Sequence, residues 1–240
     1  MTATIFHRIY QPLRRGLPGQ LSSGLRSVAT AFLTPFYFSI QSGHFLSSLQ
    51  RAAVTKKMKA LPWYTYPCID FVRFQDFADC AILEFGGGQS TLFWAARART
   101  VTTFEGDEQW FDRLKRKIPQ NVSLTLVAME TPDRTAAEIR TALGPPADRK
   151  FDVVVIDGLF RSEMIPIAVD HLSGRGMIIC DDSEGYGIYE GLAGSGFMRV
   201  DFHGHQPGVL LPHCTSIYFS PGCQFTNNTS RIHTVHEEDG

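Results

Sequence analysis

The amino-acid sequence predicts a doubly wound α/β domain whose sheet ends in an antiparallel hairpin. Three observations lead to this prediction. From about residue 79 onward, short apolar runs alternate with amphipathic segments of helical length. The run FDVVVI from Phe151 is apolar on both faces, as expected of a central strand in a parallel sheet. The last two strand candidates follow each other without a helix between them.

The expected strands and helices succeed one another at the spacing of right-handed βαβ crossovers. The helix expected over 106–118 has acidic residues in its first turn and basic residues in its last, which the helix dipole favours. The final strands, 197–205 and 214–220, would form the hairpin of a seven-stranded sheet. The preceding elements are strands at 80–85, 100–104, 122–127, 151–156 and 176–180, with helices at 90–99, 106–118, 135–143 and 162–172.

Length and composition indicate one globular domain with appendages. The 240 residues are 43% hydrophobic and 20% charged, which is enough to bury a full core. We expect a basic N-terminal extension over 1–60, a main domain over 61–220 and a flexible tail over 221–240. Five scattered cysteines without a CxxC pair argue against a disulfide framework and a thiolate metal site. A cytoplasmic location is therefore expected.

Charge divides the chain into a basic arm and an acidic body. Residues 1–69 contain eight Lys or Arg and no Asp or Glu, whereas the remainder contains 15 basic and 24 acidic residues. The net charge of -1 predicts no affinity for nucleic acid. The apolar stretch from Ser27 is interrupted by Pro35 and is shorter than the roughly 20 residues of a transmembrane helix. The arm could be a helical or flexible extension, a peripheral membrane contact or a transit peptide.

A glycine-rich loop, EFGGGQST from Glu84, follows the first expected strand. Its glycines let the backbone approach a ligand, and the next helix offers N-terminal amides. A dinucleotide fingerprint would need a glycine at Thr91, and Glu84 would repel a pyrophosphate, so an NAD-linked oxidoreductase is disfavoured. Glu105 ends the second strand, where a carboxylate can accept hydrogen bonds from both hydroxyls of a ribose.

Together these features resemble the class I S-adenosylmethionine (SAM) dependent methyltransferase family, whose first motif is an acidic residue followed by GxG. The resemblance covers roughly residues 79–220 and implies a Rossmann-like sheet with SAM as the cofactor. It implies that the glycine loop lines the methionine part and that Glu105 binds the ribose. The cofactor-binding residues expected in this way are Glu84, Gly86, Gly88, Ser90, Thr91, Glu105 and Asp157.

Three carboxylates are expected at the edge of the sheet beside this loop, because Asp157 ends one strand and Asp181 and Asp182 end the next. Adjacent like charges repel and burial penalises each, so a positive partner is expected. Three such oxygen ligands suit Mg²⁺ or another divalent cation, and their placement resembles the catechol O-methyltransferase group. That group has Asn at the position of Asp182, and its catalytic lysine has no counterpart here. Without a metal, Asp157 would face substrate and Asp181 or Asp182 would cap a turn.

Histidines near the same edge are candidates for the base that replaces the missing lysine. His203 and His205 share one face of a strand and His213 begins the next, so these three and Asp157 are the expected catalytic residues. The sequence predicts methyl transfer to a hydroxyl oxygen of a small molecule or glycan, with or without a divalent cation. An N-methyltransferase of the same fold and a non-catalytic, membrane-apposed binding module are the alternatives.

Overall fold

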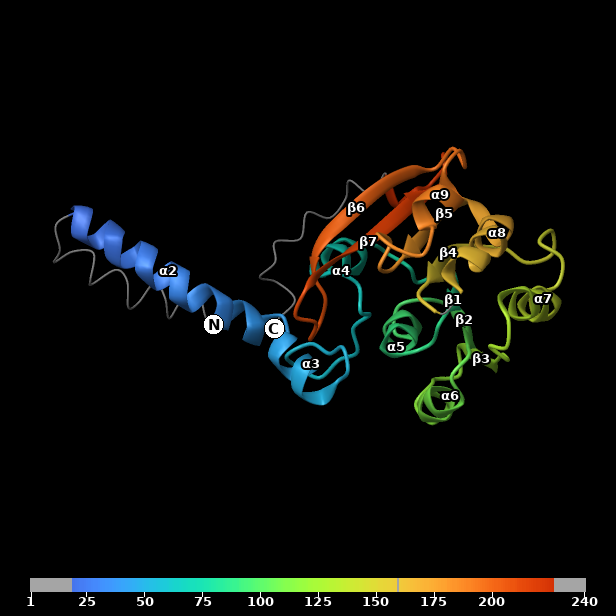
Figure 1. Cartoon of the computed structure of the whole chain (residues 1–240), viewed down its shortest axis with the longest axis horizontal. Helices are drawn as coiled ribbons and strands as arrows, with labels where there is room; N and C mark the ends of the chain where they lie inside the picture. The colour runs from blue at the N-terminus through green and yellow to red at the C-terminus, as the bar shows by residue number, and fades with distance from the viewer. Residues whose placement is uncertain (1–18, 159, 227–240) are drawn as a thin grey trace.

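The computed structural model describes residues 19–158 and 160–226, and it contains the predicted seven-stranded sheet. The strands lie in the order β3-β2-β1-β4-β5-β7-β6 (Figure 1). The first five are parallel, and β7 pairs antiparallel with both β5 and β6. The predicted hairpin is thus confirmed. The strands span Ala81–Phe85, Thr100–Glu105, Val122–Leu126, Phe151–Ile156, Leu172–Cys180, Met198–His205 and Pro212–Phe219 for β1 to β7.

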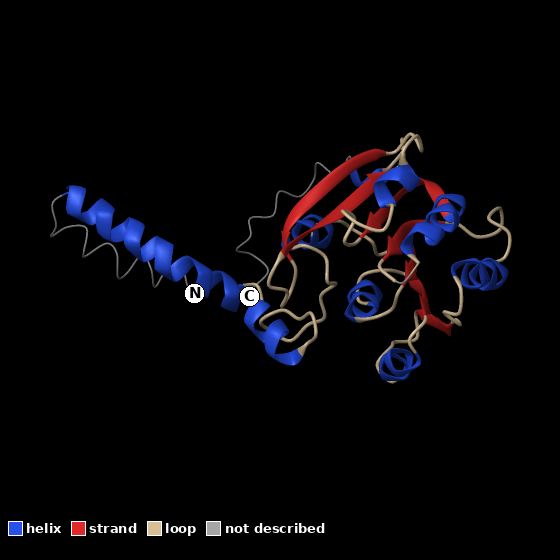
Figure 2. Cartoon of the chain, in the orientation of Figure 1, coloured by secondary structure: helices blue, strands red, loops and turns tan. Residues whose placement is uncertain are grey.

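Helices cover both faces of the sheet (Figure 2). Side chains alternate along β4, so Val153 and Val155 pack with α4 and α5 while Val154 and Ile156 pack with α7, α8 and α9. The long β-branched run therefore forms a strand that is buried on both sides. The helices of the domain are α4 (Tyr66–Arg73), α5 (Gln89–Ala95), α6 (Glu108–Lys115), α7 (Pro132–Leu143), α8 (Arg161–His171) and α9 (Ile188–Leu192).

The N-terminal extension contains α2 (Gly19–Gln41), which projects away from the domain, and the short α3 (His44–Gln50) (Figure 1). The expected helical character is found over these residues, and residues 1–18 lie outside the described part. Packing continues through the expected boundary at residue 60, because Ala53 is fully buried in the same core cluster as Ile82 of β1. Within the described ranges, no helix is both long and apolar enough to cross a membrane.

The start of the predicted tail also packs on the domain. Cys223 and Phe225 are buried, and the Phe225 ring lies 4.9 Å from that of Phe77. A short 3-10 helix, η1 (Gln224–Thr226), ends the described chain. The packed part of the chain therefore extends past the expected boundary at residue 221, because Cys223 and Phe225 are buried; the expected flexibility of 227–240 concerns residues outside the described ranges.

Candidate active site

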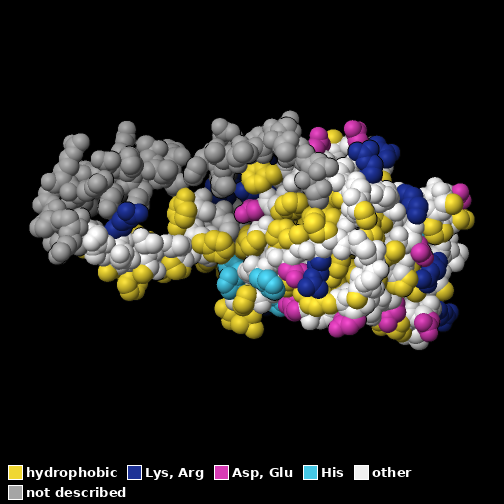
Figure 3. All heavy atoms as spheres, turned by 90° about the horizontal axis from the view of Figure 1, so that it is seen from above, with side chains coloured by type: hydrophobic (Ala, Val, Ile, Leu, Met, Phe, Trp, Pro, Cys, Tyr) yellow, Lys and Arg dark blue, Asp and Glu magenta, His cyan; other side chains and the backbone are white. Residues whose placement is uncertain are grey.

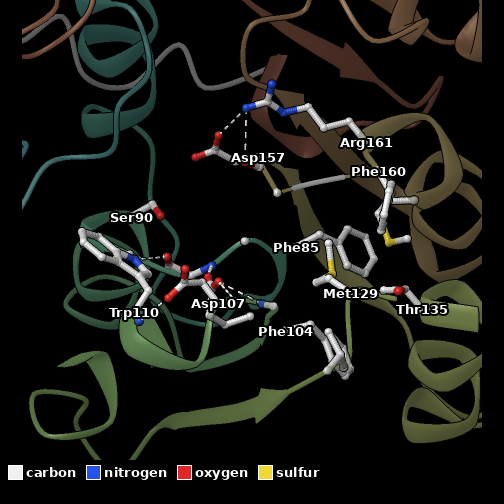
Figure 4. Close-up of a pocket in the computed structure, with 18 of the residues that line it drawn as sticks. Phe85, Ser90, Phe104, Asp107, Trp110, Met129, Thr135, Asp157, Phe160 and Arg161 are labelled. Atoms are coloured by element: carbon white, nitrogen blue, oxygen red, sulfur yellow. Dashed lines mark hydrogen bonds and ion pairs between the residues drawn. The ribbon is translucent and has the colours of Figure 1, made fainter. Parts of the chain in front are cut away.

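A cavity of about 350 Å³ lies at the carboxyl ends of β1, β2 and β4. The loops that follow these three strands line it, together with Trp63 from the segment before α4. Figure 4 shows three groups around it: Ser90 and Trp110 on one side, Phe85, Phe104 and Met129 on another, and the ion pair of Asp157 with Arg161. The cavity occupies the position where open α/β sheets bind ligands.

The glycine loop forms one wall of the cavity, and its backbone adopts a conformation that residues with a Cβ atom rarely take. Gly86 has a φ of 96°, and a Cβ at this position would lie 2.6 Å from the backbone nitrogen of Gly158. The loops after β1 and β4 therefore touch, and both positions line the cavity. Gly88 and Ser90 line it as well, at the start of α5.

Glu105 joins the end of β2 to the glycine loop. Its Oε2 accepts the Gly87 N–H at 2.6 Å, and its Oε1 accepts the N–H groups of Gly106 and Asp107 at 2.9 and 2.8 Å. Burial raises the pKa of Glu105, an effect that these three hydrogen bonds oppose. An ionised carboxylate offers about four acceptor positions. Glu105 lines the cavity and retains capacity to accept a hydroxyl from a ligand.

Glu84 and Thr91, which the sequence assigned to the cofactor, lie beneath the loop and do not line the cavity. The Glu84 Oε2 accepts the hydroxyls of Thr91 and Thr103 at 2.5 and 2.9 Å, while the Thr91 hydroxyl accepts the Gly88 N–H at 2.9 Å. Burial raises the pKa of Glu84 to about 7. Both side chains therefore support the glycine loop from its core side, because Glu84 near the end of β1 is fully buried.

Two tryptophans complete the wall beside the glycine loop. Trp110 of α6 donates its Nε1–H to the carbonyl oxygen of Gly87 at 2.6 Å, and its ring stacks on Trp63 at 6.4 Å between centroids. Trp63 belongs to an aromatic segment, LPWYTYP from Leu61, that leads into α4. Sequence analysis missed Trp110, whose only signal is an aromatic residue in the first turn of the helix after β2.

Arg161 supplies the positive partner that the carboxylates required. Its guanidinium donates to Asp157 Oδ1 at 3.0 Å and lies 3.6 Å from Asp182 Oδ2. The guanidinium also sits over the Tyr186 ring, 4.4 Å from its centroid. Burial raises the pKa of Asp157 to about 6, although Arg161 opposes the shift. Asp157 is the predicted catalytic residue that lines the cavity.

The predicted metal ligands Asp157, Asp181 and Asp182 do not form a set that fits a divalent cation. Asp181 is buried, and its oxygens accept the Thr215 hydroxyl at 2.9 Å and the Gln206 Nε2 at 3.2 and 3.3 Å. The same amide nitrogen lies 3.1 Å from Asp182 Oδ1. Arg161 and Gln206 thus direct donors at the oxygens that would have held an ion, and burial raises the pKa of Asp181.

None of the three predicted catalytic histidines lines the cavity. They belong to β6 and β7, which lie beyond β5, whereas the cavity opens over β1, β2 and β4. His213 is the cross-strand partner of Gly204, so alternation places it on the face opposite to His203 and His205. The His205 ring packs 6.3 Å from that of His44.

His213 takes part in a different cluster. Its Nδ1 lies 3.1 Å from both Asp182 Oδ1 and Glu184 Oε1. Within the described residues, Asp182, Glu184 and His213 are the one group of three His, Cys, Asp or Glu side chains whose potential metal-ligand atoms lie within 4.8 Å of one another. All three side chains are partly exposed, and exposed acidic clusters commonly occur without a metal ion, so this cluster by itself does not indicate a metal site.

Comparison with known proteins identifies the fold. No family model of protein sequences matches the chain, and no curated protein matches it. The structure is similar to that of precorrin-6y C5,15-methyltransferase from Geobacter metallireducens GS-15, with 16% identity and a TM-score of 0.50 over 72% of this chain and 96% of that one. A methyltransferase from Pyrococcus furiosus shows 20% identity and a TM-score of 0.46 over 79% of this chain and 99% of that one. The chain has the Rossmann-like fold of SAM-dependent methyltransferases.

Proposed function

We propose that this protein is a SAM-dependent methyltransferase. The observation that supports the proposal most is the contact between Glu105 and the glycine loop: the carboxylate at the end of β2 receives the Gly87 N–H, and both groups line one cavity. In this arrangement the Glu105 carboxylate could hold a ribose, and the rest of an extended ligand could lie along the glycine backbone, which no side chain covers. Phe104, Val127 and Met129 offer an apolar surface in the same cavity, which suits a purine ring.

The proposed acceptor is a hydroxyl oxygen of a small molecule or glycan. Asp157 lies at the cavity with a pKa raised to about 6, so near neutral pH it is ionised and able to accept the hydroxyl proton. SAM supplies an electrophilic methyl group. Asp157 would take the proton as the hydroxyl oxygen forms its bond to that methyl carbon and the carbon–sulfur bond breaks. Arg161 fixes the Asp157 carboxylate by its hydrogen bond.

The proposed mechanism assigns no step to a divalent cation. Arg161 already provides the positive charge between Asp157 and Asp182. Asp181, the remaining member of the predicted set, is engaged by Thr215 and Gln206. These contacts favour an acid–base mechanism that relies on side chains of this protein alone.

The test is calorimetric titration of the protein with S-adenosylhomocysteine, which is what remains of SAM after methyl transfer. We expect wild type to bind and Glu105→Gln to bind at least about tenfold more weakly, because the variant loses a charge-assisted acceptor. Glu108→Gln is the matched control, since Glu108 is exposed on the next helix and does not line the cavity. Failure of folded wild type to bind would overturn the cofactor assignment.

A further inference from the structure

An exposed apolar stripe runs along α2. Leu25, Val28, Phe32, Phe36 and Ile40 recur at helical spacing on one side, and each is between 53% and 70% exposed. Leu33 and Tyr37, 55% and 52% exposed, widen the stripe on one flank, and the opposite side of the helix carries the hydroxyl side chains of Ser27 and Thr34. Figure 3 shows the hydrophobic side chains gathered along the projecting helix. A stripe of this length exceeds the scattered apolar residues of an ordinary surface.

Further exposed apolar residues lie where the helix meets the domain. Phe45 and Leu49 of α3, one helical turn apart, are 54% and 67% exposed. The loop between β6 and β7 reaches α3, because Gly208 donates its N–H to His44 Nδ1 at 3.3 Å. In that loop Leu210 and Leu211 are 84% and 66% exposed. The apolar surface therefore continues from α2 towards the body.

The charge of this region indicates what covers the stripe. Between residues 19 and 69 there is no acidic residue, and five basic residues are present: Arg26, Arg51, Lys56, Lys57 and Lys59. Apolar surface bordered by basic residues complements a bilayer with anionic headgroups. Two copies of α2 packed together would gain no attraction between charges, because Arg26 is the single charged residue of the helix.

We propose that α2 lies in the surface of an anionic membrane with its apolar stripe inserted among the lipids. The helix would lie along the interface, because no described helix is able to span a bilayer. The active-site loops are attached to this region, since Trp63 lines the cavity and donates to the carbonyl oxygen of Pro207 at 3.1 Å. The membrane contact does not depend on the proposed methyl transfer.

Co-sedimentation of the full-length protein with vesicles tests this proposal. The vesicles contain phosphatidylcholine alone or phosphatidylcholine mixed with phosphatidylglycerol. We expect binding to the anionic vesicles, weakened by salt. Binding should be about tenfold weaker for Phe32→Glu, because an aromatic side chain that would insert among the lipids is replaced by a charge. Ser27→Glu adds the same charge on the opposite, exposed side of the same helix and is expected to retain most of the binding.

Three results would overturn the proposal. One is that wild type fails to sediment with anionic vesicles, and another is that Phe32→Glu and Ser27→Glu bind equally well. The third is that wild type forms a dimer without lipid, detected by light scattering, that Phe32→Glu dissociates this dimer, and that wild type does not bind vesicles. The stripe would then be a contact between two copies. Circular dichroism of both variants verifies that each is folded.

Discussion

Asp157 is the side chain on which burial, ion pairing and the proposed chemistry converge. It lines the cavity, pairs with Arg161 at 3.0 Å and has a pKa raised to about 6, mainly by burial. A carboxylate in water would titrate at about 3.9 and would be a weaker base. Its surroundings therefore bring the proton affinity closer to the pH at which the protein would work.

Replacing Asp157 should abolish methyl transfer without abolishing cofactor binding. For Asp157→Asn we expect a loss of turnover of at least about a hundredfold, because general-base catalysis typically contributes that much. Binding of S-adenosylhomocysteine should change little. In wild type the rate should rise with pH through about 6, where Asp157 ionises, and then level off. Asp170→Asn, on the exposed side of α8, is the control; equal turnover in Asp157→Asn and wild type would refute the role.

Glu84 is expected to make the stability of the fold depend on pH. Its pKa is raised to about 7 by burial, so the folded state keeps a proton that the unfolded chain loses above about 4.3. Since the folded state then binds more protons, the free energy of unfolding falls as the pH rises from about 4.5 to 7 and stays lower above that range. The shift corresponds to at most about 4 kcal/mol.

The variant Glu84→Gln should remove this pH dependence. Its amide oxygen can still accept the Thr91 and Thr103 hydroxyls, while no charge forms in the core. We expect the free energy of unfolding, measured with urea at pH 5 and pH 8, to differ less between the two pH values in the variant than in wild type. An identical difference in both proteins would mean that Glu84 does not ionise in this range.

At the scale of elements, the loop between β1 and α5 is held in place by backbone contacts. Gly86 has positive φ and touches Gly158, so the turns after β1 and β4 pack directly against each other. From below, the Glu84–Thr91 pair ties the strand end to the helix start, and the Thr91 hydroxyl receives the Gly88 N–H. The shape of the cavity wall thus depends on the absence of side chains at these glycines.

Gly86→Ala should disrupt this loop. A Cβ would meet the Gly158 backbone at 2.6 Å in a region of φ that side chains rarely adopt. We expect a loss of about 1–3 kcal/mol in the free energy of unfolding and weaker binding of S-adenosylhomocysteine. Gly174→Ala is the matched control, because nothing lies within 4 Å of a Cβ there and no positive φ is involved. If both variants unfold alike, the close approach of the two loops is not important for stability.

At the scale of the whole molecule, the chain combines a packed α/β body with a projecting helix, α2, that carries no acidic residue (Figure 1). The acidic residues all lie from Asp70 onward, so the body and the arm differ in charge as well as in packing. The arm is joined to the body, since Gly208 donates its N–H to His44 Nδ1 at 3.3 Å and Ala53 is buried in the core. Vesicle binding and cofactor binding can therefore be tested on one molecule and can fail separately.

The sequence by itself determined the order of the elements and the edge at which the cavity lies. The local patterns are the strand and helix periodicity, the glycines from Gly86 to Gly88 and the carboxylates at strand ends. Because parallel strands bring their carboxyl ends to one edge of the sheet, these patterns predict that the ligand site lies at that edge. Gly86, Gly88, Ser90, Glu105 and Asp157 indeed line one cavity.

Only the tertiary structure decided which polar side chains face the cavity and which are held by other partners. Glu84 points into the core, Asp181 is bonded to Thr215 and Gln206, and the histidines lie on the far side of β5. Arg161 joins Asp157 and Asp182, which are 25 residues apart in sequence, in the position where a metal ion was expected. Such pairings depend on contacts between distant segments, whereas sequence periodicity reports only how each segment presents its own faces.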